Sequence, residues 1–289
     1  MTWIGVDIGG SHIAAAQICL SGDDVSISNF VEADVDTFGE VNEIIREWSR
    51  VIRQANGGAA DMKVGIAMPG PYDYENGVSL IKDQGKMKSL LGLSVRNLLA
   101  ESLAIDPKAI VFTNDAEAFL LGESLAGAGR SFKNAIGLTL GTGLGSAIKI
   151  EDVVKDAKLW TAPFRDGIAE DYLGTSWFKT QSFQKFGLEI AGVKELLAKE
   201  FDSQVSDSIF AEFGRTLGEF LEQYIIRLHC QGVVLGGKIA RASERFIPYT
   251  QAYLAPLHYP FEIKVSEMEE KATLVGACHP FLSESQMKS

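Results

Sequence analysis

Short apolar runs that end in glycine or proline alternate along the chain with segments of helical period. Residues 3–8 and 13–20 are predicted to be buried strands joined by the turn Gly9-Gly10-Ser11. Apolar side chains then recur at three- and four-residue steps over residues 41–52, which predicts a helix that stops at Asn56-Gly57-Gly58. This alternation of strands and helices predicts the α/β fold class.

Further apolar runs extend this pattern. Residues 63–68 are predicted to form a strand that ends at Pro69-Gly70-Pro71, and residues 109–112 a strand that leads into a helix over 116–125. Late in the chain, residues 209–228 carry apolar and aromatic side chains at helical spacing. We interpret these aromatic side chains as core.

A weak internal repeat relates the two halves of the chain. The segment Ile4–Ser11 aligns with Ile136–Gly143, and both are short apolar strands that run into a glycine-rich turn. The repeat places Thr139 where Asp7 stands, so only the first half supplies that charge. Strand-turn sequences are common, and chance similarity is the alternative. A true repeat predicts two related halves that present two glycine-rich turns across one cleft.

Composition and charge narrow the function classes. The 289 residues include 27 Lys and Arg against 38 Asp and Glu, a net charge of −11, and 46% are hydrophobic. The length predicts about two domains, and the acidic balance argues against nucleic acid or an anionic membrane surface as a partner. The N-terminus has no basic lead and no window approaches a membrane-spanning length, so neither a signal peptide nor a membrane anchor is expected.

The cysteines and histidines form no recognisable metal signature. Cys19, Cys230 and Cys278 lie far apart in the sequence, and the four histidines show no ligand spacing. A reduced, cytoplasmic protein is the expected context.

The two glycine-rich turns are candidate phosphate cradles. In Gly9-Gly10-Ser11 and Gly141-Thr142-Gly143, glycine lets backbone N–H groups approach an anion, and the hydroxyls add donors. The alternative is that each turn is only a tight hairpin. The carboxylate of Asp7, just before the first turn, favours the phosphate-binding interpretation, because Mg²⁺ that accompanies bound phosphates is coordinated by such a carboxylate. The segment Gly232–Ile239 has P-loop spacing, but we reject that motif because Ile239 stands where Ser or Thr would hold Mg²⁺.

Asn114 and Asp115 stand where a predicted strand gives way to a helix. Asn114 and Glu117 have the spacing of a capping box, so this segment has a purely structural interpretation. The functional interpretation is that Asp115, at the carboxyl end of a strand, accepts a proton from a substrate hydroxyl. Glu170 is likewise either a solvated carboxylate or a ligand group.

Five motifs in order resemble the ROK family of bacterial sugar kinases, within the actin/hexokinase-like superfamily. They are Asp7-Ile8-Gly9-Gly10-Ser11, Gly65-Ile66-Ala67-Met68-Pro69-Gly70-Pro71, Asn114-Asp115-Ala116-Glu117-Ala118, Gly141-Thr142-Gly143-Leu144-Gly145 and Val234-Leu235-Gly236-Gly237-Lys238-Ile239. The resemblance implies a two-domain α/β fold of duplicated, ribonuclease H-like halves with a cleft between them. It implies domains over 1–113, completed by a C-terminal helix over about 271–283, and 114–270.

The resemblance also implies roles for single residues. Asp115 would be the catalytic base, and Asp7 would sit near Mg²⁺, through water. The sugar would be bound by Asn114, Asp115, Glu170 and Gly70. The phosphates of ATP would be held by Gly9, Gly10, Ser11, Gly141, Thr142 and Gly143, and the nucleoside would lie against Gly236 and Gly237.

Three departures from the family pattern matter. The stretch Leu159–Glu170 contains no Cys and no His where the family commonly has a zinc-binding loop, so zinc is predicted to be absent. The same stretch lacks the family's Glu and His at the anomeric end of the sugar, which leaves the sugar open. His12 stands where the family often has Lys, which predicts a weaker phosphate contact.

The activity that the resemblance implies is a glucokinase-like transfer of the γ-phosphoryl of ATP to a hexose hydroxyl, at position 6. An N-acetylhexosamine kinase of the same family and a non-catalytic sugar- or nucleotide-binding regulator are the alternatives. A homodimer is an expectation of the family alone.

Overall fold

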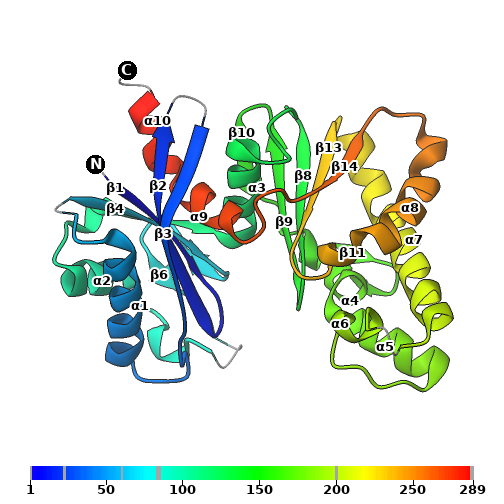
Figure 1. Cartoon of the computed structure of the whole chain (residues 1–289), viewed down its shortest axis with the longest axis horizontal. Helices are drawn as coiled ribbons and strands as arrows, with labels where there is room; N and C mark the ends of the chain where they lie inside the picture. The colour runs from blue at the N-terminus through cyan, green and yellow to red at the C-terminus, as the bar shows by residue number, and fades with distance from the viewer. Residues whose placement is uncertain (1, 22–23, 60, 83–85, 199–200, 287–289) are drawn as a thin grey trace. The chain divides into compact units, whose positions relative to one another are not determined.

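The computed structural model describes residues 2–21, 24–59, 61–82, 86–198 and 201–286, and its chain forms two compact units (Figure 1). Unit 1 comprises Met1–Arg130 together with Glu270–Ser289, and unit 2 comprises Ser131–Glu269. The chain therefore leaves unit 1 once, builds unit 2 and returns to complete unit 1.

Unit 1 is built on a five-stranded sheet with the order β3-β2-β1-β4-β7. The strands are β1 (Thr2–Ile8), β2 (His12–Ser21), β3 (Asp24–Asp34), β4 (Met62–Met68) and β7 (Ile110–Asn114), and a small hairpin is formed by β5 (Tyr72–Asp73) and β6 (Val78–Ser79). Strand β1 pairs antiparallel with β2 and parallel with β4, which pairs parallel with β7. The carboxyl ends of β1, β4 and β7 therefore share one edge of the sheet.

Helices cover both faces of this sheet. The helices of unit 1 are α1 (Val41–Asn56), α2 (Val95–Leu103), α3 (Asp115–Ala126), α9 (Lys271–Ala277) and α10 (His279–Gln286). Ile4, Val6 and Ile8 of β1 are buried in one cluster with Trp48 of α1. Because side chains alternate along a strand, Gly5 and Asp7 point to the opposite face.

Helix α9 packs directly on the sheet face that carries Asp7, so that the backbone of the helix lies against the backbone of the strands. A Cβ atom at Gly5 would collide with the carbonyl oxygen of Leu274 in α9, and one at Gly65 would collide with that of Ala277. The predicted helix over about 271–283 is in fact two helices, α9 and α10, which are separated at Cys278.

Unit 2 repeats this plan with the strand order β10-β9-β8-β13-β14. Its strands are β8 (Ala135–Leu140), β9 (Leu144–Ile150), β10 (Val153–Asp156), β13 (Gly232–Gly236) and β14 (Glu262–Val265), with a small hairpin of β11 (Pro163–Phe164) and β12 (Gly167–Ile168). Its helices are α4 (Ala169–Leu173), α5 (Thr175–Phe186), α6 (Val193–Leu196), α7 (Ser203–Arg227) and α8 (Ser243–Leu254). The aromatic side chains predicted to be core, Phe210, Phe213 and Phe220 of α7, are buried in one cluster with β8.

The internal repeat predicted from the sequence is present in the two sheets. Strand β8 pairs antiparallel with β9 and parallel with β13, as β1 pairs with β2 and β4. The outer strands also correspond, because β9 pairs antiparallel with β10 and β13 pairs parallel with β14. The two units thus share one sheet topology.

The compact units divide the chain at a different place from the expected boundary after Thr113. Helix α3 belongs to unit 1, which extends to Arg130. The physical reason is close packing: a Cβ at Gly122 of α3 would collide with the backbone of α9, and one at Gly276 of α9 with the backbone of α3.

Candidate functional site

The first glycine-rich turn is a tight connection between β1 and β2. The Gly9 N–H donates to the carbonyl oxygen of His12 at 3.0 Å, and the Ser11 carbonyl accepts from the Val35 N–H at 2.9 Å. The hydroxyl of Thr37, which is buried, donates to the Gly10 carbonyl at 2.6 Å. The turn is therefore fixed from both sides.

Asp7 lies just before this turn, on the face covered by α3 and α9. In the register of the sheet Asp7 pairs with Ala67 of β4, which pairs with Thr113 of β7. Asp115, the first residue of α3, follows two positions later, so both carboxylates belong to the same edge of the sheet. Burial, the Asp115 carboxylate and the Glu270 carboxylate together raise the pKa of Asp7 to about 7.

Asn114 is held by three hydrogen bonds. Its Oδ1 accepts from the N–H of Ala116 at 3.0 Å and of Glu117 at 3.1 Å, so Asn114 caps α3 as the structural interpretation predicted. Its Nδ2 donates to the hydroxyl of Tyr74 at 3.1 Å. Gly70 borders the same hydroxyl, because a Cβ at Gly70 would lie 3.5 Å from the Tyr74 oxygen.

A lysine lies beside the first turn. A Cβ at Gly10 would come within 2.8 Å of Cδ and 3.1 Å of Nζ of Lys86. The next residue, Met87, is buried with a φ of 57°, and its N–H donates to the Thr37 carbonyl at 2.7 Å. This anchoring directs the positive charge of Lys86 to a turn where phosphate binding is predicted.

The second glycine-rich turn connects β8 and β9. The Gly141 N–H donates to the Gly143 carbonyl at 3.0 Å, and the Gly141 carbonyl accepts from the N–H and the hydroxyl of Thr175 at 2.9 and 2.8 Å. Glu170 of α4 reaches into this turn, where its Oε2 accepts from the Leu144 N–H at 2.9 Å. A Cβ at Gly143 would collide with that Oε2 atom.

Gly236 ends β13 beside the second turn, and Gly237 follows it. Gly237 has a φ of +85°, and a Cβ there would collide with the carbonyl oxygen of Leu140, the last residue of β8. The Ile239 N–H donates to the same carbonyl at 3.0 Å. The conformation and the contact both require glycine at position 237.

The predicted site residues therefore fall into two groups. Unit 1 holds Asp7, Gly9, Gly10, Ser11, Gly70, Asn114 and Asp115, and unit 2 holds Gly141, Thr142, Gly143, Glu170, Gly236 and Gly237. Sequence reasoning missed Lys86, Tyr74 and Glu270, which reach these groups through loops or from the distant end of the chain. It expected Glu170 at the sugar and did not foresee its hydrogen bond to the second turn.

The side chains near the first turn can be compared with the ligands that metal ions prefer. Among the described residues, no group of three or more His, Cys, Asp or Glu is arranged to hold a metal ion. Mg²⁺ in phosphoryl-transfer sites is bound by one or two carboxylates, water and substrate phosphates, so Asp7 with its neighbouring carboxylates fits that ion. The absence of zinc stays a prediction.

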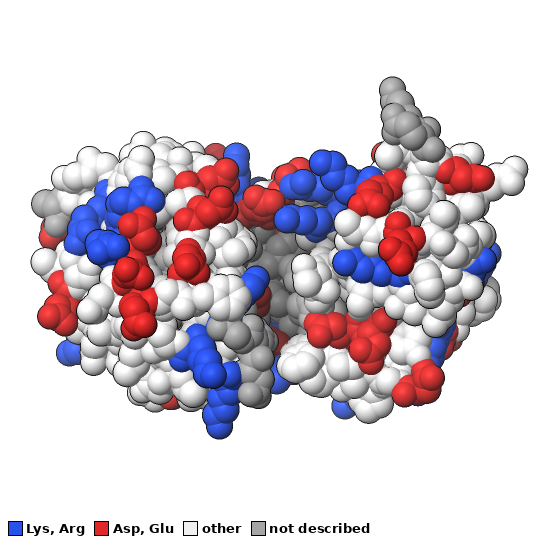
Figure 2. Space-filling model, turned by 90° about the horizontal axis from the view of Figure 1, so that it is seen from below, with Lys and Arg blue, Asp and Glu red and all other residues white. Residues whose placement is uncertain are grey.

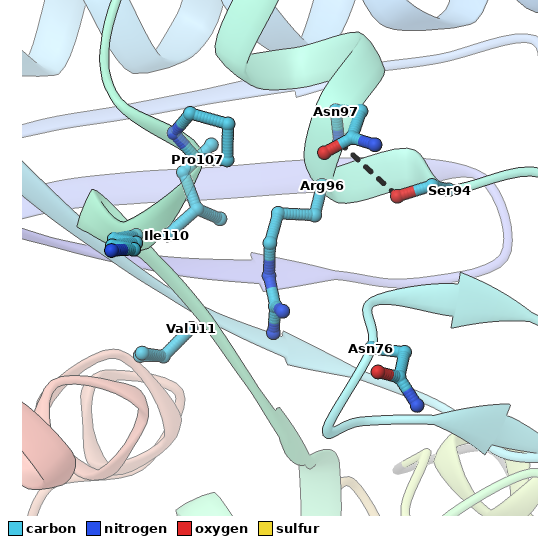
Figure 3. Close-up of a pocket in the computed structure, with 8 residues that line it drawn as sticks. Asn76, Ser94, Arg96, Asn97, Pro107, Ile110 and Val111 are labelled. Carbon is cyan, nitrogen blue, oxygen red and sulfur yellow. Dashed lines mark hydrogen bonds between the residues drawn. The ribbon is translucent and has the colours of Figure 1, made fainter.

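A shallow surface depression of about 410 Å³ in unit 1 lies at the opposite end of β7 from Asn114 (Figure 3). It is lined by Arg96, Lys108, Ile110 and neighbouring polar residues. None of the predicted site residues lines it.

Charge is mixed over the surface seen in Figure 2, where acidic and basic side chains lie side by side on both units. In the part of the chain that the structure describes, no helix has the length and apolar character to cross a bilayer.

The chain is similar in sequence and fold to several known proteins. A sequence model described as the ROK family matches residues 3–157. A glucokinase of Thermotoga maritima is 32% identical over 95% of this chain and 95% of its own length. A ROK family glucokinase from Streptomyces griseus, solved with glucose and AMPPNP, is 20% identical with a TM-score of 0.76 and covers 97% of this chain and 99% of its own.

A third relative, a Listeria monocytogenes protein provisionally named an N-acetylmannosamine kinase, is also 20% identical, with a TM-score of 0.77 over 99% of this chain and 100% of its own. The structural likenesses establish that the fold is the predicted actin/hexokinase-like α/β fold.

Proposed function

The chain belongs to the ROK family, and we propose that it is an ATP-dependent sugar kinase. The observation that carries this proposal is the pair Asp7 and Asp115 at one edge of the unit 1 sheet, directly beside the turn Gly9-Gly10-Ser11. We assign one carboxylate to a cation beside phosphates and the other to a proton on a hydroxyl. Phosphoryl transfer from ATP to a sugar requires both.

Asp115 is the proposed general base. It accepts the proton of the attacking sugar hydroxyl as that oxygen forms a bond to the γ-phosphorus and the bond to ADP breaks. Its backbone is fixed because Asn114 caps the helix that Asp115 begins. Burial, followed by the negative charges of Asp115 and Glu270, raises the pKa of the neighbouring Asp7 to about 7.

The phosphates are proposed to lie against the two glycine-rich turns. In unit 1, Lys86 adds positive charge beside Gly10. Asp7 would hold hydrated Mg²⁺, which neutralises phosphate charge when it is bound. Gly236 and Gly237, at the end of β13, are proposed to lie against the nucleoside. An acidic protein thereby binds an anion through local backbone amides and cations.

The proposed substrate is a hexose phosphorylated at its 6-hydroxyl. Support comes from the Thermotoga maritima glucokinase and from the glucose bound in the Streptomyces griseus structure. Asn114, Asp115 and Gly70 in unit 1 and Glu170 in unit 2 are the proposed sugar ligands. The alternative substrate is an N-acetylhexosamine, which the relative from Listeria monocytogenes favours.

An ADP-release assay with Mg²⁺, ATP and a panel of hexoses, N-acetylhexosamines and ketoses tests the function and names the sugar. We expect turnover with at least one hexose. Asp115→Ala should lower kcat roughly 10²–10⁴-fold, the range for loss of a general base, with ATP binding preserved. A folded wild-type protein that turns over no sugar in the panel would refute the kinase proposal and favour a binding protein.

A further inference from the structure

Tyr74 is not among the predicted site residues, yet its side chain contacts the proposed sugar ligand Asn114. Its hydroxyl donates to the Met68 carbonyl at 3.0 Å and accepts from Asn114 Nδ2 at 3.1 Å. The same oxygen borders Gly70. One phenol therefore contacts the end of β4, the Gly70 segment and the Asn114 amide.

These hydrogen bonds have only one possible direction. A backbone carbonyl can only accept, so the Tyr74 hydroxyl must donate to Met68 and accept from Asn114. At the other end, the N–H groups of Ala116 and Glu117 can only donate, so they fix the oxygen of the Asn114 amide toward the helix. The Asn114 nitrogen, with one N–H on Tyr74, presents its second N–H as a donor.

The turn that carries Tyr74 is itself held firmly. Asn76 donates to the Asp73 carboxylate through its backbone N–H at 3.1 Å and its side chain at 2.8 Å. Arg96, whose side chain points between β7 and this turn in Figure 3, donates from Nη2 to the Tyr74 carbonyl at 3.3 Å. The phenol is thus anchored at its backbone as well as at its hydroxyl.

We propose that Tyr74 is a positioning residue of the sugar site, which holds the Asn114 amide so that its remaining N–H donates to a sugar hydroxyl. The proposal rests on the proposed function, because it deepens the role of Asn114 as a sugar ligand. Tyr74 acts through Asn114 and takes no part in the transfer of the phosphoryl group.

The chain offers a matched control two residues away. Tyr72 packs against Tyr74 with ring centroids 5.3 Å apart, and its buried hydroxyl has no hydrogen-bond partner among the described residues. Tyr72→Phe and Tyr74→Phe remove the same atom from neighbouring rings. Only the second breaks the hydrogen bond to Asn114.

Steady-state kinetics of the whole chain test the functional half of the inference. For the sugar that the panel identifies, Tyr74→Phe should raise KM about 10-fold, the effect of one misplaced hydrogen bond, with KM for ATP unchanged and kcat within about 3-fold. Tyr72→Phe should leave all three constants unchanged. In the double variant Tyr74→Phe/Asn114→Ala, the Tyr74 effect should vanish, because its target amide is gone.

The inference would be overturned if Tyr74→Phe and Asn114→Ala had independent effects on sugar KM, or if Tyr74→Phe kept the wild-type sugar KM. Either result would leave the kinase proposal intact. A structural role alone would lower Tm without the selective rise in sugar KM.

A second readout needs no turnover. The side-chain amide resonances of Asn114, assigned through Asn114→Asp, should shift in Tyr74→Phe and stay in place in Tyr72→Phe. Unshifted resonances in Tyr74→Phe would show that the hydrogen bond is absent and would refute the inference even if the protein phosphorylates no sugar. An inactive wild type that keeps this shift would refute only the proposed function.

Discussion

The two glycine-rich turns occupy equivalent places in two sheets of the same topology, yet different charged side chains surround them. The turn of unit 1 follows Asp7 and has Lys86 beside Gly10. The turn of unit 2 follows Thr139, and the Glu170 carboxylate accepts from its Leu144 N–H. The first turn therefore has both a carboxylate and a lysine beside it, whereas a carboxylate of α4 contacts the second turn.

This difference shows how a duplicated scaffold divides one task. The shared hairpin supplies backbone amides in both units, whereas charge is supplied by side chains that the repeat does not encode. Lys86, Asp115 and Glu270 reach the first turn from outside the β1–β2 hairpin, and Glu170 reaches the second from α4. The two turns should therefore respond unequally to matched substitutions.

The largest expected effect comes from the aligned pair Asp7 and Thr139. Asp7→Asn removes the proposed Mg²⁺ carboxylate and should lower kcat/KM roughly 10²–10³-fold, an effect of several kcal/mol on charge stabilisation. Thr139→Val should change kcat/KM less than about 3-fold, because no chemistry is assigned to that position. Initial rates at several Mg²⁺ concentrations measure both variants, and equal losses would show that the turns are equivalent.

Glu170 gives the next largest effect. Its Oε2 holds the Leu144 N–H, and we expect its Oε1 to accept from a sugar hydroxyl. Glu170→Gln keeps an oxygen for Leu144, so KM for the sugar should rise about 10-fold with KM for ATP unchanged. Glu170→Ala should raise both KM for the sugar and KM for ATP. A rise in the ATP KM alone in either variant would assign Glu170 to the second turn and not to the sugar.

Lys86 should give a smaller effect, because its side chain is exposed and solvent screens its charge. Lys86→Met should raise KM for ATP about 3-fold, and the rise should shrink in high salt. Lys88→Met, two residues away and also exposed, is the matched control. Identical ATP KM values for the two variants would show that Lys86 is too far from the phosphates to contribute.

The smallest effect concerns stability. The pKa of Asp7 is raised to about 7 from its ordinary value near 3.8, so folding takes up a proton at this group between those values. Its contribution to stability is full below pH 4 and is lost as pH rises through about 7. The Asp7→Asn variant should therefore melt a few degrees above wild type at pH 8 without Mg²⁺ and lose that advantage as pH falls to about 4. A variant less stable than wild type at pH 8 would contradict this.

Local sequence patterns predicted the elements that hold the site. The runs around Gly9 and Gly141 became the hairpins of β1–β2 and β8–β9, and the helix stop at Gly57 is a left-handed cap with a φ of 61°. These signals are local, because strand period and glycine turns act over a few residues. The repeat could be recognised for the same reason.

The residues that sequence reasoning missed depend on contacts between distant segments. Nothing in the local sequence distinguishes Tyr74 from other turn residues. Its role depends on hydrogen bonds to Met68 at the end of β4 and to Asn114 at the end of β7. Glu270 affects Asp7 only because the end of the chain returns to unit 1. Sequence periodicity does not encode contacts between distant segments, so the side chains that surround a site are harder to predict than the backbone elements that form it.

Helix α9 packs on the Asp7-bearing face of the unit 1 sheet, and its late place in the chain has a consequence for synthesis. On a ribosome, β1, β4 and β7 emerge first, and the helix that packs on Gly5 and Gly65 is translated only after all of unit 2. A nascent chain therefore lacks both the cover of that face and the Glu270 charge that acts on Asp7. Asp7 therefore reaches its working environment only after the whole of unit 2 has been made.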